Sequence, residues 1–319
     1  MGKHLIVGAS GQLGVELMLA LQAQHGPEQV LLADLRPVPH PDAALSKSLT
    51  LDATESHAVR RVLEGEDIST VYMLVAMLSA RGESMPLAAW ELNMTSLLVM
   101  LEAAKDGLVD QVFWPSSIAV FGPDAPKENT PQHTALVPTT VYGLSKVSGE
   151  LWCQYYHDKH GVDVRSLRYP GLIGYRSQPG GGTTDYAVEA FGKALTGESM
   201  VCYLHPDERL PMMSMEDAIR ATIQLLEAPH VGIRTSYNLS GCSFSPRELE
   251  ACIQSQIPDF HMVYIPDHRQ GIAASWPDTI DDSQAQADWN WSAKHDLQGL
   301  MNYMFQGLGQ LTERETRLG

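Results

Sequence analysis

The sequence predicts an α/β fold, with a doubly wound parallel sheet in the first half of the chain and a smaller lobe in the second. Strand-like and helix-like segments alternate up to about residue 170, which is the pattern of a parallel sheet covered by helices on both faces. A glycine-rich turn follows the first strand-like segment. The chain has 319 residues, of which 44% are hydrophobic, enough for one large α/β unit with an appended lobe.

The alternation can be followed segment by segment. It starts with a short apolar strand and a helix whose leucines fall on one stripe. Pro86 is well placed in the first turn of the longest early helix. The strands are expected at residues 3–8, 29–34, 48–51, 70–76, 111–115 and 162–168, and the main helices at residues 12–24, 54–63, 86–106 and 141–160.

The rhythm changes after Pro170. Residues 178–182 contain three glycines and predict a flexible loop, and polar residues from Thr183 onward suit the start of a helix. We therefore expect an approximate boundary between a nucleotide-binding domain at residues 1–170 and an interleaved substrate-binding lobe at residues 171–319. Three tryptophans are expected in the core of that lobe, namely Trp276, Trp289 and Trp291.

Composition excludes several classes of function. The formal net charge is −16 and no basic stripe is present, so neither nucleic acid nor an anionic membrane is an expected partner. The four cysteines form no C-x-x-C pair, no signal peptide precedes the first strand, and no apolar run reaches the roughly 20 residues of a membrane span. His157 and His160 lack further ligands at zinc-like spacing, so no metal is expected. A cytoplasmic location follows as an expectation.

The glycine-rich turn is Gly8-Ala9-Ser10-Gly11-Gln12-Leu13-Gly14, a G-x-x-G-x-x-G sequence between a strand and a helix. Glycine lets the backbone turn tightly and approach a pyrophosphate without a Cβ in the way, and the helix N-terminus offers free N–H groups and a positive dipole end. The first half is therefore expected to be a Rossmann-type domain that binds a dinucleotide through Gly8, Ser10, Gly11, Gln12, Leu13 and Gly14.

An acidic residue at the end of the second strand indicates which dinucleotide is bound. Asp34 lies 20 residues after Gly14, where a carboxylate accepts hydrogen bonds from the ribose hydroxyls and repels a 2′-phosphate. NAD is therefore expected rather than NADP, although Arg36 nearby is compatible with NADP. Asp52, after the third strand, suits the adenine amino group, and a helix cap for the segment from Thr54 is the alternative.

Tyr142 and Lys146 form a Y-x-x-x-K pair on one face of a predicted helix. A tyrosine normally titrates near ~10, too high for a base at neutral pH, and a cation one turn away stabilises the phenolate. Tyr142 is therefore the expected general base for a substrate hydroxyl. The fifth strand ends in Pro115-Ser116-Ser117, where a serine can bind the substrate oxygen or only satisfy the loop backbone.

These motifs resemble the extended short-chain dehydrogenase/reductase superfamily along nearly the whole chain. The markers are residues 8–14, 116–122 and 142–146. The resemblance implies that Ser117, and not Ser116, is the catalytic serine, with Tyr142 as the base and Lys146 as the lysine that binds ribose and stabilises the phenolate. It also implies a structural role for Asn93. The residues expected to border the cofactor, besides Tyr142 and Lys146, are Leu74, Ala76 and Tyr169.

Segments at residues 78–83, 168–173, 182–187, 275–277 and 281–283 are similar to the short-chain L-threonine 3-dehydrogenases, above all Gly182-Thr183-Thr184-Asp185-Tyr186-Ala187. This resemblance implies NAD-dependent oxidation of L-threonine at the 3-hydroxyl to 2-amino-3-oxobutanoate, a step of threonine catabolism. Ser79 and Thr184 are the expected donors to the substrate carboxylate. Asp185 is the candidate acceptor for the ammonium or, alternatively, a cap for its own helix. The 178–182 loop is either a lid or an uninvolved surface loop.

Two rival functions remain on the same fold. A nucleotide-sugar epimerase or dehydratase often carries an asparagine soon after the R-Y dipeptide, where this chain has Arg168-Tyr169-Pro170-Gly171. A catalytically silent NAD-sensing regulator usually lacks the Tyr-Lys pair that is present here. By analogy with the family, a homodimer through the helices at 86–106 and 141–160 is expected.

Overall fold

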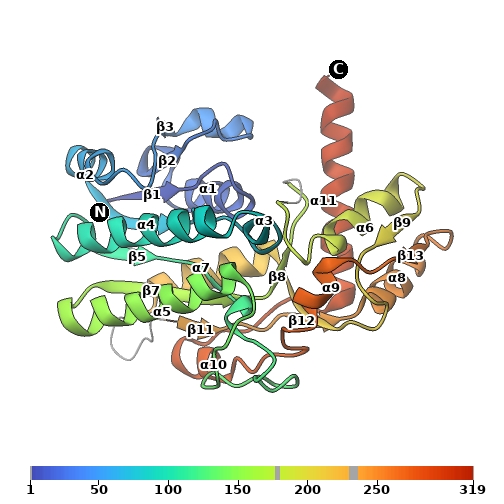
Figure 1. Ribbon diagram of the computed structural model, residues 1–319. Helices are drawn as coiled ribbons and strands as arrows, with labels where there is room; N and C mark the ends of the chain where they lie inside the picture. Colours follow the sequence, from blue (N-terminus) through green and yellow to red (C-terminus); the bar gives the residue numbers. More distant parts are fainter. Residues whose placement is uncertain (1, 177–179, 230–235, 319) are drawn as a thin grey trace.

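The computed structural model describes residues 2–176, 180–229 and 236–318, with side chains up to residue 311. Its largest feature is a parallel sheet with the strand order β11-β7-β5-β4-β1-β2-β3, and the short β6 also pairs with β7 (Figure 1). These strands are β1 (Lys3–Val7), β2 (Val30–Asp34), β3 (Lys47–Thr50), β4 (Ile68–Met73), β5 (Gln111–Phe113), β6 (Ser116–Ser117), β7 (Asp163–Tyr169) and β11 (Ser236–Asn238).

The sheet is buried on both faces, which explains why its strands are apolar runs and not alternating ones. Leu5 and Val7 of β1 enter one core, while Ile6 enters the core on the opposite face, and all three are fully buried. Burial of each such side chain contributes about 1.5–3 kcal/mol. The order of the strands reverses between β1 and β4, so a crevice is expected outside their carboxyl ends.

Two layers of helices cover this sheet (Figure 1). One layer contains the two long helices that lie side by side, and the other contains the helix that follows the glycine-rich turn. The first layer consists of α2 (Ser56–Gly65), α4 (Pro86–Lys105) and α5 (Val141–His160), with α3 (Ser79–Ser84) at its end, and the second of α1 (Gln12–His25), α7 (Met215–Glu227) and α10 (Ser283–Trp289).

The remaining elements form the second lobe, which has its own core. Two small sheets, with the orders β12-β10-β8 and β13-β9, lie among four helices. The elements are β8 (Gly171–Ile173), β9 (Met200–Cys202), β10 (Leu210–Ser214), β12 (Cys242–Phe244), β13 (Met262–Tyr264), α6 (Tyr186–Leu195), α8 (Pro246–Gln254), α9 (His268–Ala273) and α11 (Leu297–Leu318).

The chain returns to the main sheet after it has entered the second lobe. β11 pairs in parallel with β7, and α7 packs on α1. A boundary drawn at residue 170 would therefore separate this strand and its covering helix from the sheet to which they belong.

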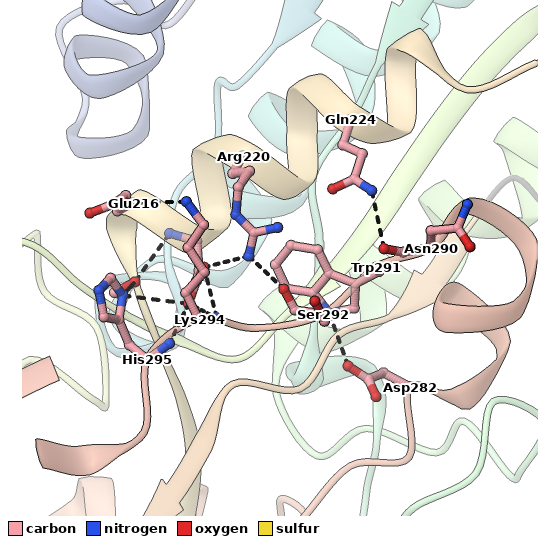
Figure 2. A network of polar contacts seen from close by, with 11 residues as sticks. Glu216, Arg220, Gln224, Asp282, Asn290, Trp291, Ser292, Lys294 and His295 are labelled. Carbon is pink, nitrogen blue, oxygen red and sulfur yellow. Dashed lines mark hydrogen bonds and ion pairs between the residues drawn. The ribbon is translucent and has the colours of Figure 1, made fainter. Parts of the chain in front are cut away.

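A polar network fastens the segment before α11 to α7 (Figure 2). The fully buried Asp217 accepts the backbone N–H groups of Lys294 and His295 at 3.0 and 3.1 Å. Arg220 donates to the Ser292 carbonyl and lies 4.5 Å from the centre of the Trp291 ring. The last stretch of chain is thus held against the part of the molecule that contains the main sheet before it continues into the second lobe.

Two of the three tryptophans that were expected in the core of the second lobe lie elsewhere. Trp276 lies in the core of the second lobe, as expected. Trp289 and Trp291 lie instead in the core between the main sheet, α1 and α7, and their rings are 5.6 Å apart. The sequence could not show this, because the return of residues 282–295 to the main sheet is a tertiary connection.

The predicted fold class is confirmed: the structure contains the large parallel sheet with helices on both faces. All six strands and four helices expected in the first half are present, with bounds that differ by a few residues. The fourth strand was predicted to reach residue 76 but ends at Met73, since the next residues turn toward the glycine-rich loop. The short α3 was not predicted. Within the described residues, the helices fall short of the length and hydropathy that crossing a membrane requires.

Candidate active site

The glycine-rich loop lies at the carboxyl end of β1, beside the point where the strand order reverses. Gly8 has φ +93°, a conformation that residues with a Cβ rarely adopt, and a Cβ on Gly14 would stand 2.5 Å from the Gly8 carbonyl oxygen. Gly11 precedes α1, which lacks a side-chain cap among the described residues. The first N–H groups of α1 therefore face the loop without a capping side chain, and this cradle fits the pyrophosphate of a dinucleotide.

Asp34 ends β2 next to this loop. Its carboxylate accepts the N–H groups of Ser10 and Arg36, both at 3.0 Å. The Arg36 guanidinium in turn donates to the Ser10 hydroxyl at 3.3 Å. The structure thus brings the predicted ribose-binding carboxylate into contact with the predicted phosphate loop, while Arg36 lies in the same neighbourhood.

The other residues predicted to bind the nucleotide follow neighbouring strands. Leu74 continues from β4 and its N–H donates to the Val7 carbonyl at 2.8 Å, so it and Ala76 follow β4 beside the glycine-rich loop. The carboxylate of Asp52 accepts the N–H and hydroxyl of Thr54 at 2.9 and 2.7 Å, which lowers the pKa of Asp52. Asp52 thus closes a local turn with Thr54, and the alternative of a helix cap is wrong, because α2 begins at Ser56 with Glu55 at its N-cap and no side-chain cap. Its contact with adenine stays a prediction.

The helix that carries the Tyr-Lys pair is pressed closely against the segment after β5. Thr140 caps α5, with its hydroxyl accepting the Gly143 N–H at 3.1 Å. A Cβ on Gly143 would stand 2.2 Å from the Ala119 carbonyl oxygen, and one on Gly149 would stand 2.2 Å from the Trp114 ring. These two glycines therefore permit a close approach of backbone that brings the α5 side chains to residues 114–119.

The three predicted catalytic side chains meet at this contact. A hydrogen bond links Tyr142 and Ser117, and the Lys146 ammonium lies 5.4 Å from the centre of the Tyr142 ring. Lys146 Nζ donates to the Pro115 carbonyl at 2.5 Å and lies 4.3 Å from the centre of the Trp114 ring. A phenol, an alcohol and an ammonium are thus grouped where a substrate hydroxyl would meet them.

Burial controls the charges of this group. It raises the pKa of Tyr142 to about 12, with the hydrogen bond from Ser117 acting in the opposite direction. Burial also lowers the pKa of Lys146 to about 7, while electrostatic interactions with Cys153 and Glu150 act to raise this pKa. Phenolate formation near neutral pH therefore requires that positive charge be present beside Tyr142, as a protonated Lys146 or as a cationic ligand.

Asn93 of α4 joins this site to the chain that leaves β4. Its side-chain oxygen accepts the Met77 N–H at 2.8 Å, and its side-chain nitrogen donates to the Ser145 hydroxyl at 3.1 Å. Asn93 is almost completely buried. It therefore fixes residues after β4 against α5, consistent with the structural role implied for it.

The polar residues predicted to bind the substrate lie on α3, at the end of the first helix layer, and at the start of α6 in the second lobe. The Ser79 hydroxyl lies 3.2 Å from that of Thr183, with both side chains buried. The Thr184 methyl group faces Gly171 instead. The two threonines are adjacent in sequence, so only the backbone path into α6 decides which one turns toward Ser79. The contacts of Ser79 and Thr184 with a substrate carboxylate stay a prediction.

Asp185 binds the glycine loop that precedes it. One carboxylate oxygen accepts the N–H groups of Gly181 and Gly182, both at 2.8 Å, and α6 receives no side-chain cap from it. The alternative of a cap for its own helix is therefore wrong. Burial raises the pKa of Asp185, while these N–H groups act in the opposite direction. Residues 178 and 179 of the expected lid lie outside the described residues.

Tyr169 faces away from the catalytic group. Its hydroxyl shares a hydrogen bond with Thr222 of α7, and its ring lies in the core on the opposite side of the sheet from α5. The contact of Tyr169 with the cofactor stays a prediction, which its main chain and not its ring would have to provide. Its neighbour Arg168 points to the α5 side, as alternation along a strand requires.

No group of three or more potential metal ligands occurs among the residues that the structure describes. His157 Nδ1 instead meets the Val162 carbonyl oxygen at 3.1 Å, and the His160 ring lies 5.3 Å from that of Tyr156.

The sequence did not lead us to predict that Thr183 contacts Ser79 or that Glu150 contacts Ser116. The signal for Glu150 was present, because it continues the Tyr142–Lys146 spacing by one further helical turn. Thr183 was noted only as a polar residue at a helix start.

Comparison with protein families gives one broad match. Residues 4–240 match the NAD dependent epimerase/dehydratase family, and this range contains the glycine-rich loop, α5 and β11. A protein of Staphylococcus epidermidis, described as an uncharacterized epimerase/dehydratase, is 44% identical over 97% of this chain and 98% of its own length.

Solved structures give a narrower likeness. The holo form of a GalE-like L-threonine dehydrogenase from Cupriavidus necator is 52% identical, with a TM-score of 0.93 over 96% of this chain and 99% of the other. A monomeric L-threonine 3-dehydrogenase from a metagenome is 44% identical, with a TM-score of 0.92 over 97% of this chain and 99% of the other.

Proposed function

We propose that this chain, which belongs to the NAD dependent epimerase/dehydratase family and has NAD as its cofactor, is an L-threonine 3-dehydrogenase. The product is 2-amino-3-oxobutanoate. The observation that carries the proposal is the likeness, over nearly the full length of the chain, to solved threonine dehydrogenases at 44–52% identity. The site is compatible with it, since a hydroxyl-binding triad and buried polar side chains suit a small polar substrate with a secondary alcohol.

The nucleotide-binding residues divide among the parts of NAD. The loop from Gly8 to Gly14 would hold the pyrophosphate, Asp34 the adenosine ribose and Lys146 the nicotinamide ribose. Bound NAD supplies a hydride acceptor and, in its oxidised form, a positive charge. The negative Asp34 favours NAD over NADP by repelling a 2′-phosphate.

The chemical step divides among three side chains. Tyr142 as phenolate takes the proton of the substrate 3-hydroxyl, and the hydrogen on the same carbon leaves as hydride, so a ketone forms. Ser117 donates a hydrogen bond to the substrate oxygen and keeps it in line with the phenol. Protonated Lys146 stabilises the phenolate through its charge. Ser79, Thr184 and Asp185 would bind the amino-acid end of the substrate, with Thr183 hydrogen-bonded to Ser79.

The purified chain is expected to form NADH from NAD and L-threonine, measured by its absorbance. UDP-glucose and UDP-galactose are assayed alongside, because an epimerase recycles its cofactor and gives no net NADH, and a regulator that only senses NAD transfers no hydride. Interconversion of the sugars without NADH formation from threonine would overturn the proposal in favour of the epimerase.

We also propose that the chain forms a homodimer through α4 and α5, the adjacent long helices in Figure 1. Large apolar side chains are exposed there: Leu87 is 83% exposed, Leu151 67% and Tyr155 47%. Large apolar side chains exposed on two packed helices are costly in water unless a partner covers them.

Light scattering after size-exclusion chromatography is expected to give twice the 35.0 kDa chain mass. Leu151→Glu should shift the mass toward that of the monomer, because a carboxylate would be buried in the interface. Leu45→Glu is the matched control, since Leu45 is 63% exposed on the short turn before β3. A monomeric wild type, like the metagenomic relative, would contradict the dimer.

A further inference from the structure

One face of α5 contacts three consecutive residues after β5. Tyr142 is hydrogen-bonded to Ser117, and Lys146 Nζ to the Pro115 carbonyl. One turn further along, the Glu150 carboxylate accepts the Ser116 hydroxyl at 2.6 Å. Positions i, i+4 and i+8 of the helix therefore hold a single short segment, of which only the first two contacts belong to the catalytic pair.

Glu150 is itself held from the other side by Arg168. The guanidinium donates two hydrogen bonds to the carboxylate, at 2.8 and 2.7 Å, and both side chains are more than nine-tenths buried. Arg168 lies opposite Ser116 in the β6–β7 register. A bidentate pair of this kind fixes both partners in direction as well as in distance.

Arg168 is anchored further into the molecule. Its remaining nitrogen donates to the Gln132 carbonyl at 3.0 Å and to the side-chain oxygen of Asn238 at 3.1 Å. Asn238 is fully buried at the end of β11 and donates to the carbonyls of Thr130 and Asp281. Glu150 is thus the point at which a network anchored in the main sheet reaches the catalytic helix.

We propose that Glu150 is a positioning residue of the active site, which holds Ser116, and with it Ser117, against α5 and places a negative charge one helical turn from Lys146. The proposal rests on the role that the proposed function gives to Lys146 and Ser117. A merely structural ion pair would stabilise the fold without acting on either of them.

The surroundings of Lys146 explain why its charge needs support. The side chain is almost completely buried. It faces Tyr142, Glu150 and Cys153 of its own helix, the Pro115 carbonyl and the Trp114 ring, while Arg168 lies behind Glu150. Glu150 is the carboxylate among these groups, and it acts against the burial that favours the neutral amine.

Three variants separate position from charge. Glu150→Gln keeps an acceptor for Ser116 but removes the charge and leaves Arg168 as an uncompensated cation. Glu150→Asp keeps the charge and shortens the reach. Ser116→Ala breaks only the link to the segment that carries Ser117.

The control is Asp163→Asn, which breaks another Arg–carboxylate pair on β7. Asp163 forms two hydrogen bonds with the buried Arg165, at 2.8 and 2.9 Å, at the opposite end of the strand. This variant reports the cost of a broken ion pair away from the active site.

The primary readout is the titration of Lys146, followed by NMR on the full chain labelled with [ε-13C]lysine and assigned with Lys146→Met. In Glu150→Gln the midpoint should fall by about 1 pH unit or more, since both electrostatic changes disfavour the ammonium. It should stay near that of the wild type in Ser116→Ala, Glu150→Asp and Asp163→Asn. This measurement needs no substrate, so it is independent of whether threonine is oxidised.

The second readout is the rate of NADH formation from L-threonine. Ser116→Ala and Glu150→Asp should lower kcat on the order of 10-fold, with little change in the KM for NAD, because a displaced Ser117 misaligns the substrate oxygen. A Lys146 midpoint that is the same in Glu150→Gln and Asp163→Asn, or a kcat of Ser116→Ala equal to that of Asp163→Asn, would overturn the proposal.

Discussion

Replacing Tyr142 by phenylalanine is expected to lower kcat for L-threonine by a factor on the order of 10² or more, the usual scale for the loss of a general base. The variant removes the only atom in the proposed mechanism that receives the substrate proton. It keeps the aromatic ring that lies near Lys146, and the glycine-rich loop is unchanged. The affinity for NAD should therefore be nearly unchanged. Stopped-flow or steady-state NADH formation gives kcat, and fluorescence titration gives NAD binding.

Tyr156→Phe is the matched control, because Tyr156 lies on the same helix, is buried and also loses a hydrogen bond, here to Glu102. It should keep most of the activity. The pH dependence has a defined sign: wild-type activity should rise with pH as the phenolate forms. Burial, opposed by the Ser117 hydrogen bond, raises the pKa of Tyr142 to about 12, and positive charge beside the phenol lowers it. A Tyr142→Phe variant with nearly wild-type kcat would rule Tyr142 out as the base.

The second expected result concerns substrate choice. An analogue of L-threonine that retains the alcohol but lacks the ammonium, such as 3-hydroxybutyrate, should lose up to about 10⁴-fold in kcat/KM, because it leaves buried polar groups of the site unpaired. L-serine lacks only a methyl group and should lose less, on the order of 10- to 200-fold. Similar kcat/KM values for L-threonine and the hydroxy acid would contradict a site that binds an amino acid.

Thr183 offers a direct test of the same site. Thr183→Val keeps the side-chain shape but leaves Ser79 without the hydroxyl partner that lies 3.2 Å away. The KM for threonine should rise far more than the KM for NAD, since Thr183 lies outside the nucleotide-binding residues. Thr196→Val, on the exposed end of α6, is the control and should change neither constant.

Local sequence rules predicted the parts of the site that depend on neighbouring residues. The spacing of Tyr142 and Lys146 required only a helix, and the glycines from Gly8 to Gly14 required only a turn between a strand and a helix. Asp34 followed from its position at a strand end. In each case the covalent chain itself brings the groups together, so a correct secondary structure was sufficient.

Contacts between distant residues could not be predicted in this way. Ser79 meets Thr183 across 104 residues of sequence, and the hydroxyl that faces it belongs to the first and not the second of two threonines. Tyr169 and Arg168 were equally near the site in sequence, yet alternation along β7 turns the first into the core against α7 and the second toward Glu150.

By itself, the sequence determined the fold class, the dinucleotide loop and the Tyr-Lys pair, because periodic burial and helical spacing are properties of short segments. Only the tertiary structure decided that the Ser79 hydroxyl faces Thr183, that Trp289 and Trp291 belong to the core beneath α7, and that Glu150 links Arg168 to Ser116. These contacts depend on how the chain re-enters the main sheet after residue 170 and on which face of each strand a side chain occupies. The path of the chain and the face that each side chain occupies are set by packing across the whole molecule. A shift of one residue in strand register would move each side chain to the other face of the sheet and give it different buried neighbours.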